Sequence, residues 1–172
     1  MAAGTVKTTL LKKQQGETAT TRDDVFNNGE VGGFLRTQTV IHTTVHGTET
    51  NDVGDKIALM RLPKNAIVSN IRVVSEDLHS TSAGSYNLGI EDENGTVLDD
   101  DCFGAALTGV RTDSDTNIFP SVAKKAAISK TLEEIAALAS KTVDGNFVVL
   151  VFEVAAAFDQ SGDLIVKVDY TV

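Results

Sequence analysis

The chain has 172 residues, enough for one domain with a substantial hydrophobic core. Its composition, 41% hydrophobic and 23% charged, is typical of a folded globular protein and excludes a wholly disordered one. The formal net charge of −9 argues against nucleic-acid binding and against binding to anionic membranes, because like charges repel. We therefore expect neither nucleic acid nor membrane among its partners.

The first predicted element is a flexible, extended N-terminal arm over residues 1–34. Residues 5–30 are rich in Thr, Gln, Lys, Asp and Asn and have neither helical nor strand periodicity. So little apolar surface cannot offset the entropy lost when the segment becomes ordered. The sequence leaves open whether the arm is a disordered tail or docks on a neighbouring subunit. In the second case its apolar residues bind the partner, namely Leu10, Leu11, Val25, Phe26 and Phe34.

Strand patterns begin at Leu35. β-Branched residues fill 35–45, and a strand over 55–61 places Ile57 and Leu59 on one face. This strand is expected to end at Leu62-Pro63, because proline cannot donate to a β-ladder. In the next strand, 66–74, alternation predicts one face made of Ile67, Ser69, Ile71 and Val73, opposite Val68, Asn70 and Arg72.

A β-hairpin is the clearest local prediction. Residues 85–92 place Tyr86, Leu88 and Ile90 on one side, and 96–98 form the returning strand. Asn94-Gly95 between them tolerates the positive φ of tight hairpin turns. The Gly-, Ala-, Thr- and Asp-rich stretch that follows Phe103 has no clear periodicity.

One short helix and two strands complete the chain. Thr131 and Glu134 fit a capping box, and Leu132, Ile135, Ala136 and Ala139 follow at helical spacing. Residues 147–154 are almost continuously apolar, which predicts a strand buried on both faces, and 159–162 turn into a last strand over 163–172. We therefore predict a mainly β fold: an antiparallel, jelly-roll-like β-sandwich over residues 35–172, with one short helix.

No motif for phosphate binding, dinucleotide binding, zinc proteolysis or nucleophilic serine chemistry is present in the sequence. His42 and His46, four residues apart, can share a strand face and so could bind a metal, but ordinary polar strand positions explain them better. The single cysteine, Cys102, fits a small core residue better than a reactive thiol, because no histidine is near it in sequence. We expect no catalytic residue, no cofactor, no metal site and no enzyme activity.

Acidic residues gather at the predicted hairpin. Glu91–Glu93 and Asp99–Asp101 are expected to face each other across it. Oxygen-rich clusters can hold Ca²⁺, although the spacing does not fit an EF-hand loop. A solvated acidic edge that discourages sheet-to-sheet pairing explains the same residues, so the sequence leaves a bound cation open.

Part of the chain resembles virion proteins of tailed bacteriophages. The resemblance covers a short strand, a Leu-Pro-Lys turn and a long strand (55–74), the hairpin (86–99), the helix (132–138) and the closing strands (147–154 and 163–172). Residues 1–34 have no counterpart in it. The pattern is a general layout of elements and carries no diagnostic motif.

The resemblance implies a protein on the virion's capsid surface, made in the host cytoplasm, that decorates or cements the shell. Its implied partners are the major capsid protein and further copies of itself, a trimer being the expected homo-oligomer. The alternatives are a tail or fibre-base adaptor and a carbohydrate- or cell-surface-binding sandwich. The last is disfavoured because the chain has no Trp and two Tyr, and sugar sites use aromatic platforms.

Overall fold

The computed structural model describes residues 5–7, 35–45, 52–80, 84–110, 113–121 and 123–172. The strands in this part of the chain are β1 (Thr5–Lys7), β2 (Arg36–Thr44), β3 (Lys56–Pro63), β4 (Ile67–Ser75), β5 (Ser85–Asp92), β6 (Val97–Leu107), β7 (Ser114–Phe119), β8 (Phe147–Ala156) and β9 (Gly162–Thr171). A 3-10 turn, η2 (Lys125–Ala127), and the helix α2 (Leu132–Leu138) lie between β7 and β8.

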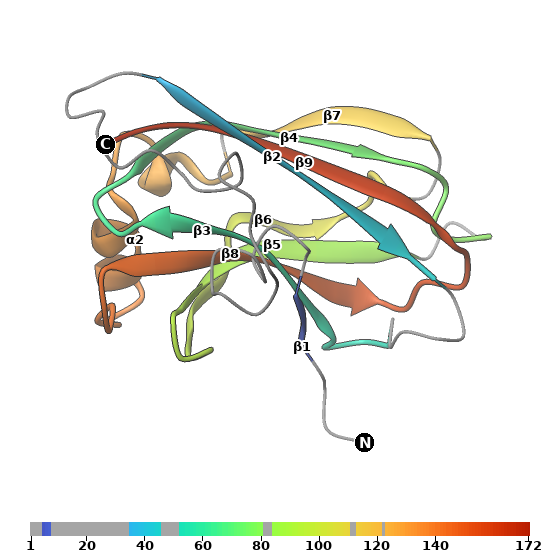
Figure 1. Cartoon of the computed structure of the whole chain (residues 1–172), viewed down its shortest axis with the longest axis horizontal. Coiled ribbons are helices and arrows are strands. Elements are labelled where there is room, and N and C mark those ends of the chain that lie inside the picture. The colour runs from blue at the N-terminus through green and yellow to red at the C-terminus, as the bar shows by residue number, and fades with distance from the viewer. Residues whose placement is uncertain (1–4, 8–34, 46–51, 81–83, 111–112, 122) are drawn as a thin grey trace, which may run out of the picture.

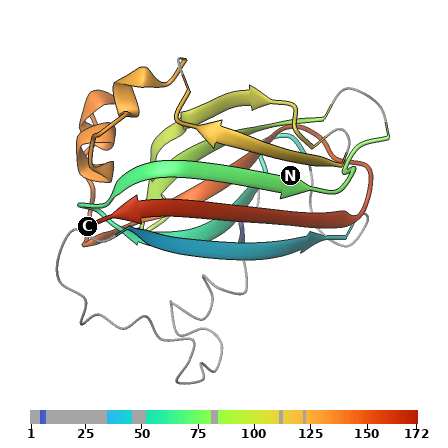
Figure 2. The same ribbon diagram turned by 90° about the horizontal axis from the view of Figure 1, so that it is seen from above.

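The strands form two stacked sheets, as Figure 1 shows. One has the order β1-β3-β8-β5-β6 and the other β2-β9-β4-β7. Figure 2 looks onto the second sheet, where these four strands lie side by side. Apart from the parallel β1–β3 pair, all paired strands are antiparallel. The predicted mainly β, antiparallel, jelly-roll-like sandwich with one short helix is confirmed.

The core lies between the sheets and consists mostly of aliphatic side chains, as alternation along the strands predicts. Leu164, Val166 and Val168 of β9 face inward and are fully buried. The aromatic rings add two contacts: Tyr86 stacks on Phe152 at 4.1 Å, and Phe103 meets Phe119 edge-on at 5.1 Å. The edge-on geometry of the second pair is one that aromatic rings prefer.

Strand β8 is buried on both faces, as its apolar sequence predicts. Val148, Leu150 and Phe152 point into the main core, whereas Val149 and Val151 join Ala58 of β3 in a second buried cluster. The outer face of the five-stranded sheet is therefore partly apolar as well. A cation–π contact adds to it, since the Arg61 guanidinium lies 4.1 Å from the Phe147 ring centroid.

The predicted hairpin joins β5 to β6. The Asp92 carboxylate accepts hydrogen bonds from the backbone N–H groups of Asn94 and Thr96, at 2.9 and 2.8 Å. Gly95 has a φ of +83°, the left-handed conformation that makes glycine favourable in this turn. The Asn94-Gly95 hairpin turn predicted from the sequence is thus present in the structure.

The alternation expected in β4 is wrong in its first half. Val68, and not Ile67, faces the core, while Ile71 and Val73 face inward as predicted. A β-bulge between Val68 and Asn70 is the reason, because one extra residue reverses the side-chain alternation.

Strand β6 is much longer than the returning strand expected at 96–98, and β7 was not predicted. Asp99–Asp101 belong to β6, which continues to Leu107. Leu88 and Ile90 of β5 pair with Gly104 and Asp99 of β6, so β6 advances five residues where β5 advances two. We call residues 99–104, which depart from regular pairing, the excursion of β6. Such an excursion hides the two-residue period that identifies a strand in sequence.

The helix begins with the predicted capping box. The Thr131 hydroxyl accepts from the Glu134 backbone N–H at 3.2 Å, and the Glu134 carboxylate accepts from the Thr131 N–H at 2.8 Å. Leu132, Ile135 and Ala136 are buried, but Ala139 is exposed because the helix ends at Leu138. No helix in the described ranges is long and apolar enough to span a membrane.

Strand β1 lies within the predicted arm. Its backbone pairs in parallel with β3, with Thr5 opposite Lys56 and Lys7 opposite Ala58. The polar sequence of residues 5–30 did not predict a strand there. The arm residues named as partner-binding, Leu10, Leu11, Val25, Phe26 and Phe34, lie outside the described residues.

Candidate interaction surface

The outer face of the four-stranded sheet carries an ordered set of side-chain rows. These rows follow from the strand registers, since residues directly opposite each other on neighbouring strands share a face. Ile41 of β2 lies opposite Ile165 of β9, which lies opposite Val74 of β4. We call these three residues the apolar row. Ile41 is 57% exposed, so the row is open to solvent.

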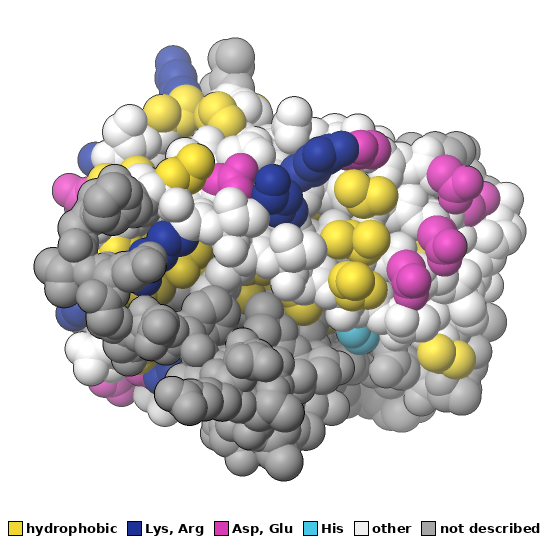
Figure 3. Space-filling model, turned by 45° about the horizontal axis from the view of Figure 1, so that its top comes forward, with side chains coloured by type: hydrophobic (Ala, Val, Ile, Leu, Met, Phe, Trp, Pro, Cys, Tyr) yellow, Lys and Arg dark blue, Asp and Glu magenta, His cyan; other side chains and the backbone are white. Residues whose placement is uncertain are grey.

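An acidic row lies two residues away from the apolar row along the strands. Asp163 is opposite Thr43 on β2, and the Thr43 hydroxyl donates to its carboxylate at 2.6 Å. On the other side, the Glu76 carboxylate accepts from the Asp163 backbone N–H at 2.9 Å. Figure 3 shows hydrophobic side chains over these strands with acidic side chains beside them.

A basic row lies on the opposite side of the apolar row. Lys167 of β9 is opposite both Thr39 of β2 and Arg72 of β4. Both cations already have carboxylate partners. Arg72 forms an ion pair with Asp115 of β7, and Lys167 lies 3.9 Å from Asp169. The hydrogen bonds and charge of Arg72 lower the pKa of Asp115.

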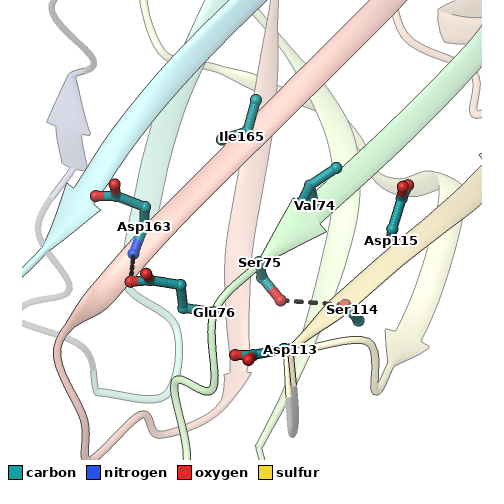
Figure 4. A pocket seen from close by; sticks show the side chains of 8 residues that line it. All are labelled: Val74, Ser75, Glu76, Asp113, Ser114, Asp115, Asp163 and Ile165. Carbon is teal, nitrogen blue, oxygen red and sulfur yellow. Dashed lines mark hydrogen bonds between the residues drawn. The ribbon is translucent and has the colours of Figure 1, made fainter.

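A hollow of about 420 Å³ opens where β4 ends and where β7 and β9 begin, as Figure 4 shows. Its lining includes four carboxylates, those of Glu76, Asp113, Asp115 and Asp163. Ser75 and Ser114 also line it, and their hydroxyl oxygens lie 3.2 Å apart, within hydrogen-bonding distance. Val74 and Ile165 connect the hollow to the apolar row, so one continuous surface offers both apolar and acidic contacts.

Asp169 is tied to both of its neighbouring strands. Its carboxylate accepts hydrogen bonds from the Thr37 hydroxyl at 2.6 Å and from the Asn70 amide at 3.2 Å. The Thr37 hydrogen bond is the main reason why the pKa of Asp169 is lowered. Because the folded-state pKa lies below the unfolded one, the stabilisation is present above the unfolded value of about 4 and is lost as pH falls through the folded value.

We therefore expect Asp169→Asn to lower the free energy of unfolding by about 1 kcal/mol at pH 6 and to flatten its loss between pH 6 and pH 3. Urea unfolding at both pH values measures this. Equal pH dependence in wild type and Asp169→Asn would contradict the assignment.

The structure brings the two acidic groups together in part, since Glu91 and Asp100 line the same small pocket with Glu153. Glu91 forms an ion pair with Lys56, Asp92 caps the hairpin turn, and Glu93 forms an ion pair with Arg61. Asp99–Asp101 lie together in the excursion of β6, with their acidic groups within 4.8 Å of one another.

The carboxylates of the β6 excursion have partners of their own. Lys124 lies 2.8 Å from Asp101, and the Asp101 backbone N–H donates to Asp99. Burial is the main reason why the pKa of Asp99 is raised. Nothing among these contacts identifies a ligand.

Cys102, His42 and His46 are the remaining residues that the sequence raised as possible reactive or metal-binding groups. Cys102 is 5% exposed within the main core, and burial raises the pKa of its thiol, which opposes thiolate chemistry. His42 faces inward from β2 and is 7% exposed, whereas His46 lies outside the described residues. The apolar, acidic and basic rows could not be predicted from the sequence, because each row joins residues from three distant segments.

No family model matches the chain, and no curated protein matches it in sequence. Solved structures match it in fold. A chain in the capsid of Ralstonia phage GP4 is 16% identical, with a TM-score of 0.57 and 97% of both chains covered. A chain in the capsid asymmetric unit of cyanophage Pam1 is 18% identical, with a TM-score of 0.55, covering 86% of this chain and 91% of that one. The resemblance to phage virion proteins is thus confirmed at the level of the fold.

Proposed function

We propose that this chain is a non-enzymatic structural protein of a tailed-phage virion that decorates or cements the capsid shell. The observation that carries the proposal is the fold match to a phage capsid chain, which covers 97% of both chains. The proposed location is the capsid surface, after synthesis in the host cytoplasm.

The surface chemistry supports an outward-facing position. A net charge of −9 repels packaged DNA and favours the solvent side of a shell. The proposed partners are the major capsid protein and further copies of this chain, in a homo-oligomer that we take to be a trimer. Symmetry then repeats each weak contact many times, so that avidity stabilises the shell.

The arm is proposed to add contacts with neighbouring subunits through Leu10, Leu11, Val25, Phe26 and Phe34. Removing residues 1–34 tests this poorly, because the deletion also removes β1 and uncovers part of the β3 edge. The sharper change is Leu10→Ser with Leu11→Ser, which keeps the chain length and charge. Val53→Ser is the matched control, since Val53 is 66% exposed in the turn before β3.

The test uses phage heads produced without this protein, to which the purified full-length chain is added. We expect saturable co-sedimentation with the heads and a higher melting temperature of the shell. The double serine variant should bind about tenfold more weakly, because two buried leucines are lost from the contact, and Val53→Ser should bind like the wild type. An absence of co-sedimentation at saturating protein would reject the proposed function.

A further inference from the structure

We propose that the apolar row and the acidic hollow bind the segment Leu10–Lys13 of a neighbouring copy of this chain. Leu11 would cover the apolar row and Lys13 would enter the hollow, because alternate residues of an extended chain share a face. The inference rests on the proposed assembly role and names the surface and the segment that join one copy to the next.

The charge of the hollow selects a basic occupant. Within the described part of the chain, no cation pairs with Glu76, Asp113 or Asp163, while Asp115 is paired with Arg72. Three carboxylates around one hollow produce a negative potential that attracts a cationic group and steers its approach. Lysine side chains also carry an apolar stem, which suits the neighbouring Val74 and Ile165.

The dimensions favour an extended segment over a single ion. Among the described residues, only Asp99–Asp101 hold three acidic groups within 4.8 Å, so the carboxylates of the hollow are too far apart to surround one cation. The apolar and acidic rows are two residues apart along β9, at 165 and 163, or about 7 Å. On an extended chain Leu11 and Lys13 are also two residues apart and share a face, so they have the same spacing as the two rows.

The N-terminal sequence is the part of this chain with the complementary chemistry. Its first 16 residues contain three lysines and no acidic residue, so all 24 acidic residues lie beyond them. Leu10-Leu11-Lys12-Lys13 places two large apolar residues next to two of these lysines. The chain is therefore polarised, with a basic end and an acidic body, which favours head-to-tail contacts between copies.

The topology favours a neighbouring copy as the source of the segment. β1 holds Thr5–Lys7 beside β3 in the other sheet, on the opposite side of the sandwich from β4 and β7 (Figure 1). The six residues from Lys7 to Lys13 extend at most about 20 Å. Within one copy, they would have to pass around the edge strand β2 and cross β9.

Disulfide trapping in full-length chains tests the contact directly. Lys13→Cys chains are mixed with Asp113→Cys chains under mild oxidation, and mass spectrometry identifies the linked peptides. We expect a bond between positions 13 and 113, formed at least tenfold more than with Asp144→Cys as the partner. The proposal would be overturned if no bond formed above that control. It would also be overturned if a variant with both substitutions formed the bond within one chain and the mixed single variants did not.

Charge reversal gives a second, independent measurement. Lys12→Glu with Lys13→Glu should weaken self-association at least tenfold by sedimentation, and Glu76→Lys with Asp163→Lys in the same chain should restore it. Lys125→Glu with Lys141→Glu makes the same change in net charge at other exposed sites and should have less than a twofold effect. An equal loss in this control, or no restoration, would overturn the proposal. Neither of these two measurements involves the capsid shell. If both failed while the chain still bound the shell, this inference would be wrong and the proposed function would stand.

Discussion

Phe152→Ala is expected to lower the free energy of unfolding by about 3–5 kcal/mol, the range for removing a large aromatic side chain from a core. Phe152 lies at the centre of β8, opposite Ile57 of β3 and Leu88 of β5. Its side chain is fully buried, stacks on Tyr86 at 4.1 Å and lies 5.9 Å from the Phe158 ring. Truncation would leave a cavity where three strands meet and would remove both ring contacts.

Phe147→Ala is the matched control, because it removes the same side chain from the same strand on the outer face. There the ring is half-buried and contacts Arg61, so we expect a loss of about 1 kcal/mol. Urea unfolding followed by circular dichroism measures both. Similar losses in the two variants would contradict the assignment of the two faces of β8.

Gly89→Ala is expected to cost about 3 kcal/mol or more, although it adds a single methyl group. A Cβ at position 89 would lie 2.3 Å from the Asp100 carbonyl carbon and 2.3 Å from the Asp99 oxygen. Both are backbone atoms, so no side-chain rotation relieves the clash. The β6 excursion would have to move away from β5 and break the pairing on either side.

Gly95→Ala separates this clash from the ordinary cost of replacing glycine. Gly95 has a φ of +83°, but its Cβ would meet nothing within 4 Å. Only the left-handed backbone strain remains, about 1 kcal/mol. Thermal unfolding should therefore rank Gly89→Ala well below Gly95→Ala in stability, and the reverse order would show that β6 does not approach β5 at Gly89.

Local signals explain why much of the fold could be predicted. The capping box at Thr131 and the turn at Asn94-Gly95 depend on contacts within four residues, which are the same in any fold. The two-residue period in β5 and β9, and the continuous apolar run in β8, likewise indicate strands and their buried faces. These features were sufficient for the antiparallel sandwich and for most of its core.

The errors occur where distant strands determine the local structure. The bulge in β4 reverses the alternation at Val68 to fit β9, and the excursion of β6 fits around Gly89 of β5. The strand β1 exists through its pairing with β3, since its own sequence has no strand pattern. In each case, hydrogen bonds and packing across strands outweigh local preference.

By itself, the sequence determined the fold class, the helix, the hairpin and a chain with a basic end and an acidic body, because each depends on composition or on near neighbours. Only the tertiary structure decided which side chains share the outer sheet face. Ile41, Val74 and Ile165 are far apart in sequence, and two strand registers place them in one row beside the acidic hollow. Registers are set by the packing of whole sheets, and that energy is not contained in any one segment.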